Sequence, residues 1–121
     1  MTQQIIENNN QKIAEIVSEQ IEINNVQDFL DWMASASYEG AASLIVHEQN
    51  FNPEFFDLKT KLAGDILQKA VNYRMKIAIV GDFSQSNSNS LQAFIRECNR
   101  GQQIFFVPDR ETAVIKLTGP I

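Results

Sequence analysis

The stretch Met75-Lys76-Ile77-Ala78-Ile79-Val80-Gly81-Asp82 decides how this chain folds. Its apolar run is short and is bounded by turn-forming residues, which is typical of a strand that is buried on both faces. A helix-like stretch, Leu62 to Tyr73, precedes it, and a polar loop follows it. Because parallel strands need crossover connections, this arrangement predicts a largely parallel sheet packed against helices.

Upstream of this strand, two short β-like runs cover residues 3–8 and 11–17, around the turn Asn8-Asn9-Asn10. Asparagine tolerates the left-handed backbone that tight hairpins require, so these runs predict an antiparallel hairpin at the edge of the sheet. Glu15 is expected to point outward or to lie on the rim. The apolar residues expected to reach the core from the second run are Ile13, Ile16 and Val17.

The remaining segments alternate between helical and strand patterns. Asn24, followed three residues later by Gln27, predicts a helix start, and Pro53 predicts a short helix after a loop. Further strands are expected at 44–47 and 103–107, and further helices after Asn89 and after Pro108-Asp109. The predicted order is β-β-α-β-α-β-α-β-α, an α/β fold in one domain spanning residues 1–121.

Composition limits the classes of protein to which the chain can belong. With 44% hydrophobic and 21% charged residues among 121, it is long and apolar enough to form one sizeable core. The net charge is −5, and lysines and arginines are scattered, so nucleic acid is not expected as a ligand. No apolar stretch approaches the length of a membrane span, which predicts a soluble protein without a membrane partner.

The chain contains a single cysteine, Cys98, which cannot form an internal disulfide. It is expected on an apolar helix face beside Phe94 and Ile95, where a thiol is usually inert packing. A reducing, cytoplasmic location is therefore predicted.

The carboxyl ends of parallel strands share one edge of a sheet, and ligands usually bind there. Residues 48–60 and 82–88 are expected at this edge. We predict that a partner or ligand contacts the following side chains: Glu48, Phe55, Phe56, Asp57, Lys59, Asp82, Phe83 and Ser84. The cluster Phe51, Phe55 and Phe56 either closes over the core or forms an exposed patch for a partner.

Other chemistry is only weakly indicated. His47 ends a predicted strand and suits a general base, although contact with backbone or Glu48 is the simpler interpretation. Asp57 and Asp82 could join Glu48 as a carboxylate group facing one cleft, enough for acid–base work or for Mg²⁺ if two of them lie close together. The loop 84–90 opens a helix but lacks any phosphate-binding glycine motif. We therefore predict no cofactor, no metal and no catalytic residue.

Several longer motifs carry a resemblance to a known family. They include Asn52-Pro53-Glu54-Phe55-Phe56-Asp57-Leu58-Lys59-Thr60, Leu62-Ala63-Gly64-Asp65-Ile66-Leu67-Gln68-Lys69, Asn72-Tyr73-Arg74 and Ile77-Ala78-Ile79-Val80-Gly81-Asp82-Phe83. The chain resembles an uncharacterised bacterial family, domain of unknown function number 4180, over nearly its whole length. That resemblance implies no particular activity.

The order of elements, with its leading hairpin, also resembles the STAS modules of sulfate transporters and anti-anti-sigma factors. This resemblance implies a small cytoplasmic module that binds protein partners. Anti-anti-sigma factors carry a phosphorylated serine before their second helix, whereas Thr60 is the only hydroxyl residue in that region here. The usual kinase-controlled switch is therefore not expected.

We predict a non-catalytic regulatory domain that binds another protein through the carboxyl edge of the sheet, at residues 48–60 and 82–88. A homodimer formed through the hairpin is a further expectation. The second hypothesis is a small-molecule or anion sensor whose polar contacts are Asp57, Lys59, Asp82 and Ser84. An enzyme using Glu48, Asp57 or Asp82 is the third. An exposed apolar patch would favour the first, and an enclosed polar pocket would favour the others.

Overall fold

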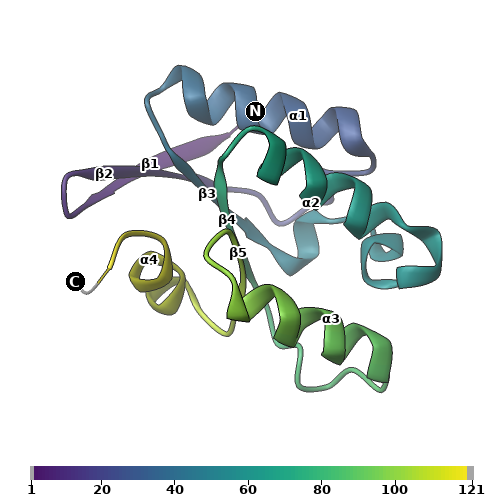
Figure 1. Ribbon diagram of the computed structural model, residues 1–121. Coiled ribbons are helices and arrows are strands. Elements are labelled where there is room, and N and C mark those ends of the chain that lie inside the picture. The colour runs from purple at the N-terminus through teal and green to yellow at the C-terminus, as the bar shows by residue number, and fades with distance from the viewer. Residues whose placement is uncertain (1, 120–121) are drawn as a thin grey trace.

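The computed structural model describes residues 2–119, so the expected domain ends at 1 and 120–121 lie outside the described residues. A five-stranded sheet with the order β1-β2-β3-β4-β5 forms the centre of the molecule (Figure 1). Its strands are β1 (Gln3–Asn8), β2 (Gln11–Ile16), β3 (Ser43–His47), β4 (Lys76–Val80) and β5 (Ile104–Val107). The α-helices are α1 (Val26–Tyr38), α2 (Leu62–Asn72), α3 (Asn89–Arg100) and α4 (Arg110–Thr118).

The sheet is mixed, as predicted. β1 and β2 are antiparallel, and each later strand runs parallel to its neighbour. Asn9 and Asn10 form the hairpin turn with φ values of 54° and 62°, the left-handed conformation that a two-residue turn requires. The predicted α/β order, with a leading hairpin followed by alternating helices and strands, is confirmed.

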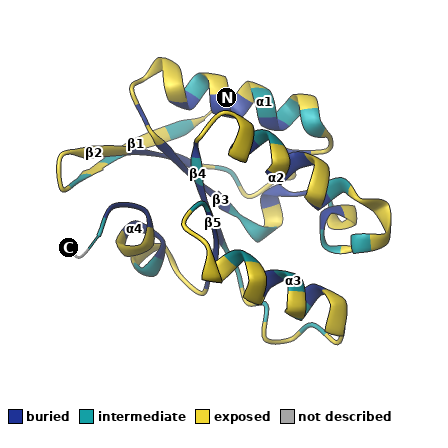
Figure 2. Cartoon of the chain, in the orientation of Figure 1, coloured by how far each residue is buried: buried dark blue, intermediate teal, exposed yellow. Residues whose placement is uncertain are grey.

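Both faces of the sheet are covered, but unequally. The helices α1, α2 and α3 pack on one face and enclose the larger core, while α4 alone covers the other face. Figure 2 shows the buried residues along the strands and on the inner sides of the helices. Alternate residues of a strand point to opposite faces, so Leu44 and Val46 enter the larger core and Ile45 faces α4.

Side-chain caps define where the helices begin. Asn25, rather than the predicted Asn24, caps α1 by accepting a hydrogen bond from the Asp28 N–H at 2.8 Å. The Asp28 carboxylate in turn accepts from the Asn24 N–H at 2.9 Å. These bonds place the cap of α1 at Asn25, one residue later than the sequence predicted.

Two predictions for the second strand were wrong. β2 ends at Ile16, and Val17 is 46% exposed, so it does not reach the core. Glu15 does not point outward: it is buried on the α4 face of the sheet, where the polar cluster described below surrounds it. In the stretch that follows, Ile23 forms an isolated parallel bridge with Phe51.

Candidate functional site

The carboxyl ends of β3 and β4 border a shallow hollow of about 390 Å³. Four predicted edge residues line it together: Glu48, Phe56, Asp82 and Phe83. We call this site the β3–β4 hollow. The rings of Phe56 and Phe83 lie 5.9 Å apart, and Phe83 also contacts the core residue Phe106 edge-on at 5.2 Å. The hollow therefore joins two half-buried aromatic rings to two carboxylates.

Gly81 allows the strand ends to approach so closely. A Cβ atom at this position would lie 2.7 Å from the Cβ of Glu48 and 2.9 Å from the ring of Phe83. Its N–H donates to the Val107 carbonyl at 3.0 Å, which keeps the end of β4 paired with β5. Only glycine leaves room for Glu48 and Phe83 to lie side by side there.

The other aromatic residues of the predicted patch are inside the protein. Phe51 is 2% exposed and Phe55 is 1% exposed, and their rings stack with centroids 4.0 Å apart. They close over the larger core, so the alternative of an exposed patch is wrong for these two residues. Phe56 is half-buried and is the only one of the three that reaches the hollow. Phe55 is therefore not available to a partner in this structure.

Three more of the predicted residues do not line the hollow. The Asp57 carboxylate accepts a hydrogen bond from the Lys59 N–H at 3.1 Å, which caps a short 3-10 helix, η3 (Leu58–Thr60). Ser84 donates its hydroxyl to Asp82 at 2.6 Å. Its hydroxyl and N–H bonds lower the pKa of the Asp82 carboxyl, which suits a turn cap better than a general base. Of the three carboxylates considered together, Glu48 and Asp82 line the same hollow, whereas Asp57 does not.

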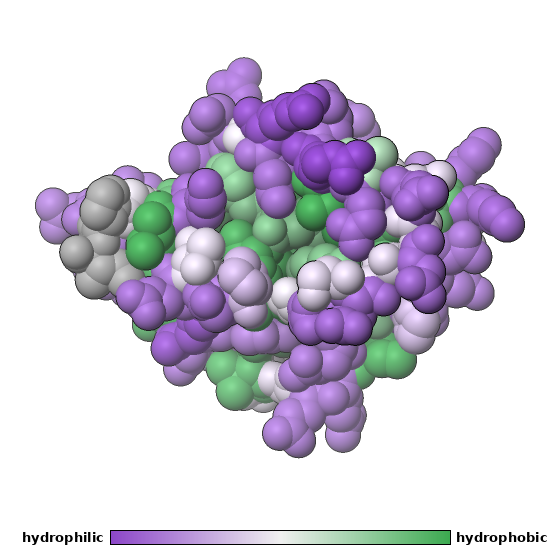
Figure 3. All heavy atoms as spheres, turned by 90° about the horizontal axis from the view of Figure 1, so that it is seen from below, coloured by the Kyte–Doolittle hydropathy of each residue, from purple (hydrophilic) through white to green (hydrophobic). Residues whose placement is uncertain are grey.

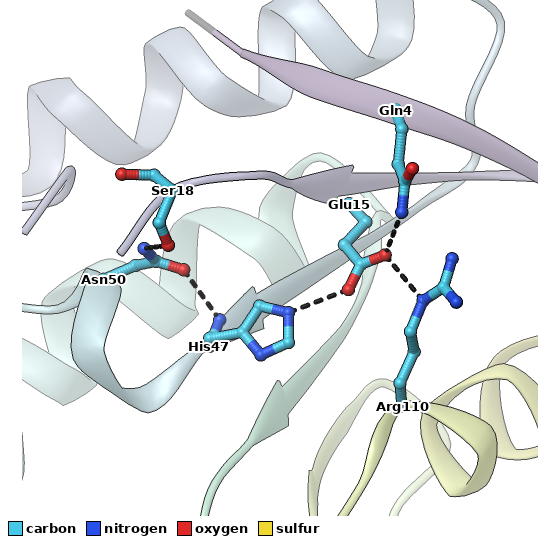
Figure 4. A network of polar contacts seen from close by, with 6 residues as sticks. All are labelled: Gln4, Glu15, Ser18, His47, Asn50 and Arg110. Carbon is cyan, nitrogen blue, oxygen red and sulfur yellow. Dashed lines mark hydrogen bonds and ion pairs between the residues drawn. The ribbon is translucent and has the colours of Figure 1, made fainter. Parts of the chain in front are cut away.

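A second polar site, which sequence reasoning missed, lies on the α4 face at the carboxyl ends of β2 and β3 (Figure 4). The Glu15 carboxylate accepts hydrogen bonds from Gln4 Nε2 and Arg110 Nε, both at 2.7 Å, and from His47 Nε2 at 2.8 Å. We call these four residues the Glu15 cluster. It connects β1, β2, β3 and α4. His47 binds Glu15 rather than Glu48, and the backbone contact expected for its side chain is present, since the ring also accepts from the Asn50 N–H.

The Glu15 cluster holds a charge that is almost removed from solvent. The Glu15 side chain is 6% exposed, whereas that of Arg110 is 52% exposed. Burial alone would raise the pKa of Glu15, but hydrogen bonds from Gln4, His47 and Arg110 outweigh it and lower the pKa. Because an ionised carboxylate only accepts hydrogen bonds, His47 donates through Nε2. The cluster borders an open groove of about 390 Å³.

Asn50 fastens the neighbouring loop to the end of β3. Its buried side chain accepts a hydrogen bond from the His47 N–H at 3.0 Å and donates to the carbonyls of Ser18 and Gln20 at 3.0 and 2.9 Å. It belongs to η1 (Glu48–Asn50), the 3-10 turn that follows β3. This amide therefore fixes His47 relative to the segment that leads from β2 to α1.

The buried carboxylate of Glu15 makes stability depend on pH. Since the pKa of Glu15 is lowered from 4.5 in the folded protein, its contribution is present above about pH 4.5 and lost as the pH falls through the folded pKa. We expect the unfolding free energy of the wild type to fall more steeply below pH 4.5 than that of Glu15→Gln. Urea unfolding between pH 7 and pH 3 tests this, and parallel pH profiles would contradict it.

Within residues 2–119, no group of three or more His, Cys, Asp or Glu side chains is arranged to hold a metal ion. The described part of the chain also has no helix with the length and apolar character needed to cross a membrane. Burial, with a smaller contribution from Glu97, raises the pKa of the Cys98 thiol to about 11, so this half-buried group is protonated at neutral pH. These features do not identify a reactive or metal-binding centre.

The fold and these sites define a small α/β domain with a mixed five-stranded sheet and polar groups gathered at the carboxyl ends of its inner strands. The chain belongs to the family described as Domain of unknown function (DUF4180), whose model matches residues 8–117. No curated protein matches the chain at a significant level.

Proposed function

We propose that this domain is a non-catalytic regulatory module of the bacterial cytoplasm that binds another protein at the β3–β4 hollow. The observation that carries the proposal is the pairing of aromatic surface with carboxylates in one open site. Phe56 and Phe83 form an apolar floor, while Glu48 and Asp82 lie beside it. The resemblance of the element order to STAS modules, which bind protein partners, adds support.

The chemistry of the hollow indicates what kind of partner segment it would accept. Among the described residues that line it there is no lysine or arginine, so its two carboxylates have no cation within the site. An arginine or lysine of the partner could lie over an aromatic ring while pairing with Asp82 or Glu48. We therefore propose a basic partner segment, which also matches the net charge of −5 on this chain.

The form of the hollow favours binding over catalysis. It is shallow and open, so bound groups would stay in contact with water, whereas acid–base chemistry generally relies on an enclosed site. Asp82 is already held by Ser84. Thr60 is also engaged, since its hydroxyl lies within 2.8 and 2.9 Å of the carbonyls of Glu54 and Asp57. The proposed mode of action is competitive docking without phosphorylation of Thr60.

A charge reversal at the hollow tests this function. Asp82→Lys changes an exposed residue and should leave the fold intact, while Glu19→Lys makes the same change of charge at the groove beside the Glu15 cluster. We expect a partner from the source organism to be retained by the wild type and by Glu19→Lys. Its affinity for Asp82→Lys should be about tenfold lower.

The measurement is affinity capture with quantitative mass spectrometry, followed by titration of the purified partner against the three proteins. Circular dichroism should first show that both variants are folded. Equal affinity of the partner for Asp82→Lys and Glu19→Lys would show that the hollow is not the docking site. A retained partner without a basic segment at its contact would contradict the proposed chemistry.

A further inference from the structure

The two edges of the sheet differ in how many backbone groups they leave open. At the β1 edge, the Val17 N–H donates to the Thr2 carbonyl at 2.9 Å, so Thr2 and Val17 are a hydrogen-bonded pair of the hairpin. Because such pairs alternate, Gln3, Ile5 and Glu7 direct their N–H and C=O groups away from β2. Within residues 2–119, no backbone hydrogen bond closes these outward groups.

The opposite edge, β5, is closed at Phe106 by a side chain. The Ile77 and Gly81 N–H groups donate to the carbonyls of Gln103 and Val107, so Ile104 and Phe106 direct their backbone groups outward. Asn99 of α3 takes the place of a neighbouring strand at Phe106. Its Nδ2 donates to the Phe106 carbonyl at 3.1 Å and its Oδ1 accepts from the Phe106 N–H at 2.7 Å.

Two further features protect β5. Pro108 follows the strand and has no N–H to offer. The strand is also short, with four residues that are each 4–6% exposed. Seen from below, the molecule shows hydrophobic residues in the middle of this side and hydrophilic residues around them (Figure 3). The addition of a strand to β5 is therefore disfavoured, although β5 is more apolar in sequence than β1.

β1 has none of these protections and is complementary to itself. It has six residues without proline, and Ile5 at its centre is 38% exposed. A two-fold axis at Ile5 places Ile5 opposite its own copy and Gln3 opposite Glu7 of the second copy. Each of these pairs would exchange two backbone hydrogen bonds, and no like charges would face each other. An axis at Glu7 would instead oppose two carboxylates.

We propose that the chain forms a two-fold symmetric homodimer in which β1 pairs antiparallel with β1 of a second copy. The occupant of the edge is a second copy because the open strand matches itself in this register. Closure of β5 by Asn99 also prevents head-to-tail addition of further copies, so that assembly stops at the dimer. This inference does not depend on the proposed function, and it leaves the β3–β4 hollow of each copy uncovered.

A proline at the centre of β1 separates the dimer from the monomer. Ile5→Pro removes an N–H that is unpaired in the monomer but central to the dimer, and proline is tolerated at such an edge position. Ile5→Val keeps the N–H and serves as the matched control. By light scattering, the 121-residue chain and Ile5→Val should have about twice the mass of 13.7 kDa, and Ile5→Pro should return to that mass while folded.

Amide hydrogen exchange gives a second measurement that does not depend on the variant. In the dimer, the Ile5 and Glu7 amides should be protected, and this protection should fall as the wild-type protein is diluted. Circular dichroism establishes whether Ile5→Pro is folded. A wild type that is monomeric at millimolar concentration with these amides unprotected would overturn the proposal, as would a folded Ile5→Pro that remains a dimer.

Discussion

Phe55→Ala is expected to lower the free energy of unfolding by about 3–5 kcal/mol. The side chain is 1% exposed, stacks on Phe51 and contacts Phe56 edge-on at 4.9 Å, so its removal leaves a cavity under the loop after β3. The free energy of unfolding of a domain is only about 5–15 kcal/mol, so the variant should lose a large part of its stability at 37 °C. Urea unfolding followed by circular dichroism measures the difference.

Phe56→Ala is the matched control for this prediction. It removes the same ring from the adjacent position of the same 3-10 helix, η2 (Pro53–Phe56), but that ring is only half-buried. Its effect on stability should be less than half that of Phe55→Ala, while its effect on partner binding should be larger. Equal losses of stability, or a loss below about 1 kcal/mol for Phe55→Ala, would show that the loop is not anchored through Phe55.

Asn50→Ala is expected to lower the free energy of unfolding by about 3 kcal/mol or more. The change leaves one N–H, that of His47, and two carbonyls, those of Ser18 and Gln20, without the amide that binds them. The three groups are only partly buried, and each of them that loses its hydrogen bond to Asn50 costs about 1 kcal/mol or more. The loss should loosen the segment from β2 to α1 and, with it, the orientation of His47 towards Glu15.

Gln49→Ala is the control for this loop, since Gln49 is the exposed neighbour of Asn50 and its replacement should change stability by no more than about 0.5 kcal/mol. Urea unfolding of the two variants measures the effect, and amide exchange at His47 reports on the lost hydrogen bond. If Asn50→Ala were as stable as Gln49→Ala, water would have to replace the side-chain amide. Asn50 would then not be the residue that anchors the loop.

The two polar sites meet at the end of β3, but they differ in how far the sequence predicts them. His47 is directed to the α4 face and Glu48 to the β3–β4 hollow, so successive residues of one chain segment serve the two sites. The hollow was partly predictable because Glu48, Phe56, Asp82 and Phe83 follow strands that the sequence pattern identifies. The Glu15 cluster was not, because its arginine comes from a helix 95 residues later in the chain.

One local signal pointed to the Glu15 cluster. In the run Ile13-Ala14-Glu15-Ile16, a single charge interrupts residues that are otherwise apolar on both faces. Such a strand lies inside a sheet, where a carboxylate remains charged only if hydrogen bonds and a cation replace its water. The pattern could identify Glu15 as exceptional, but its partners could be known only from the packing of α4.

The sequence by itself determined the order of strands and helices, the hairpin and the place of the carboxyl edge, because apolar periodicity, turn residues and crossover rules act over short distances. Only the tertiary structure decided that Phe51 and Phe55 are buried, that Asp57 caps a turn instead of joining Asp82, and that Asn99 closes β5. Each of these outcomes depends either on contacts between separate segments of the chain or on a local turn that binds a side chain. The periodicity of apolar residues contains neither kind of information.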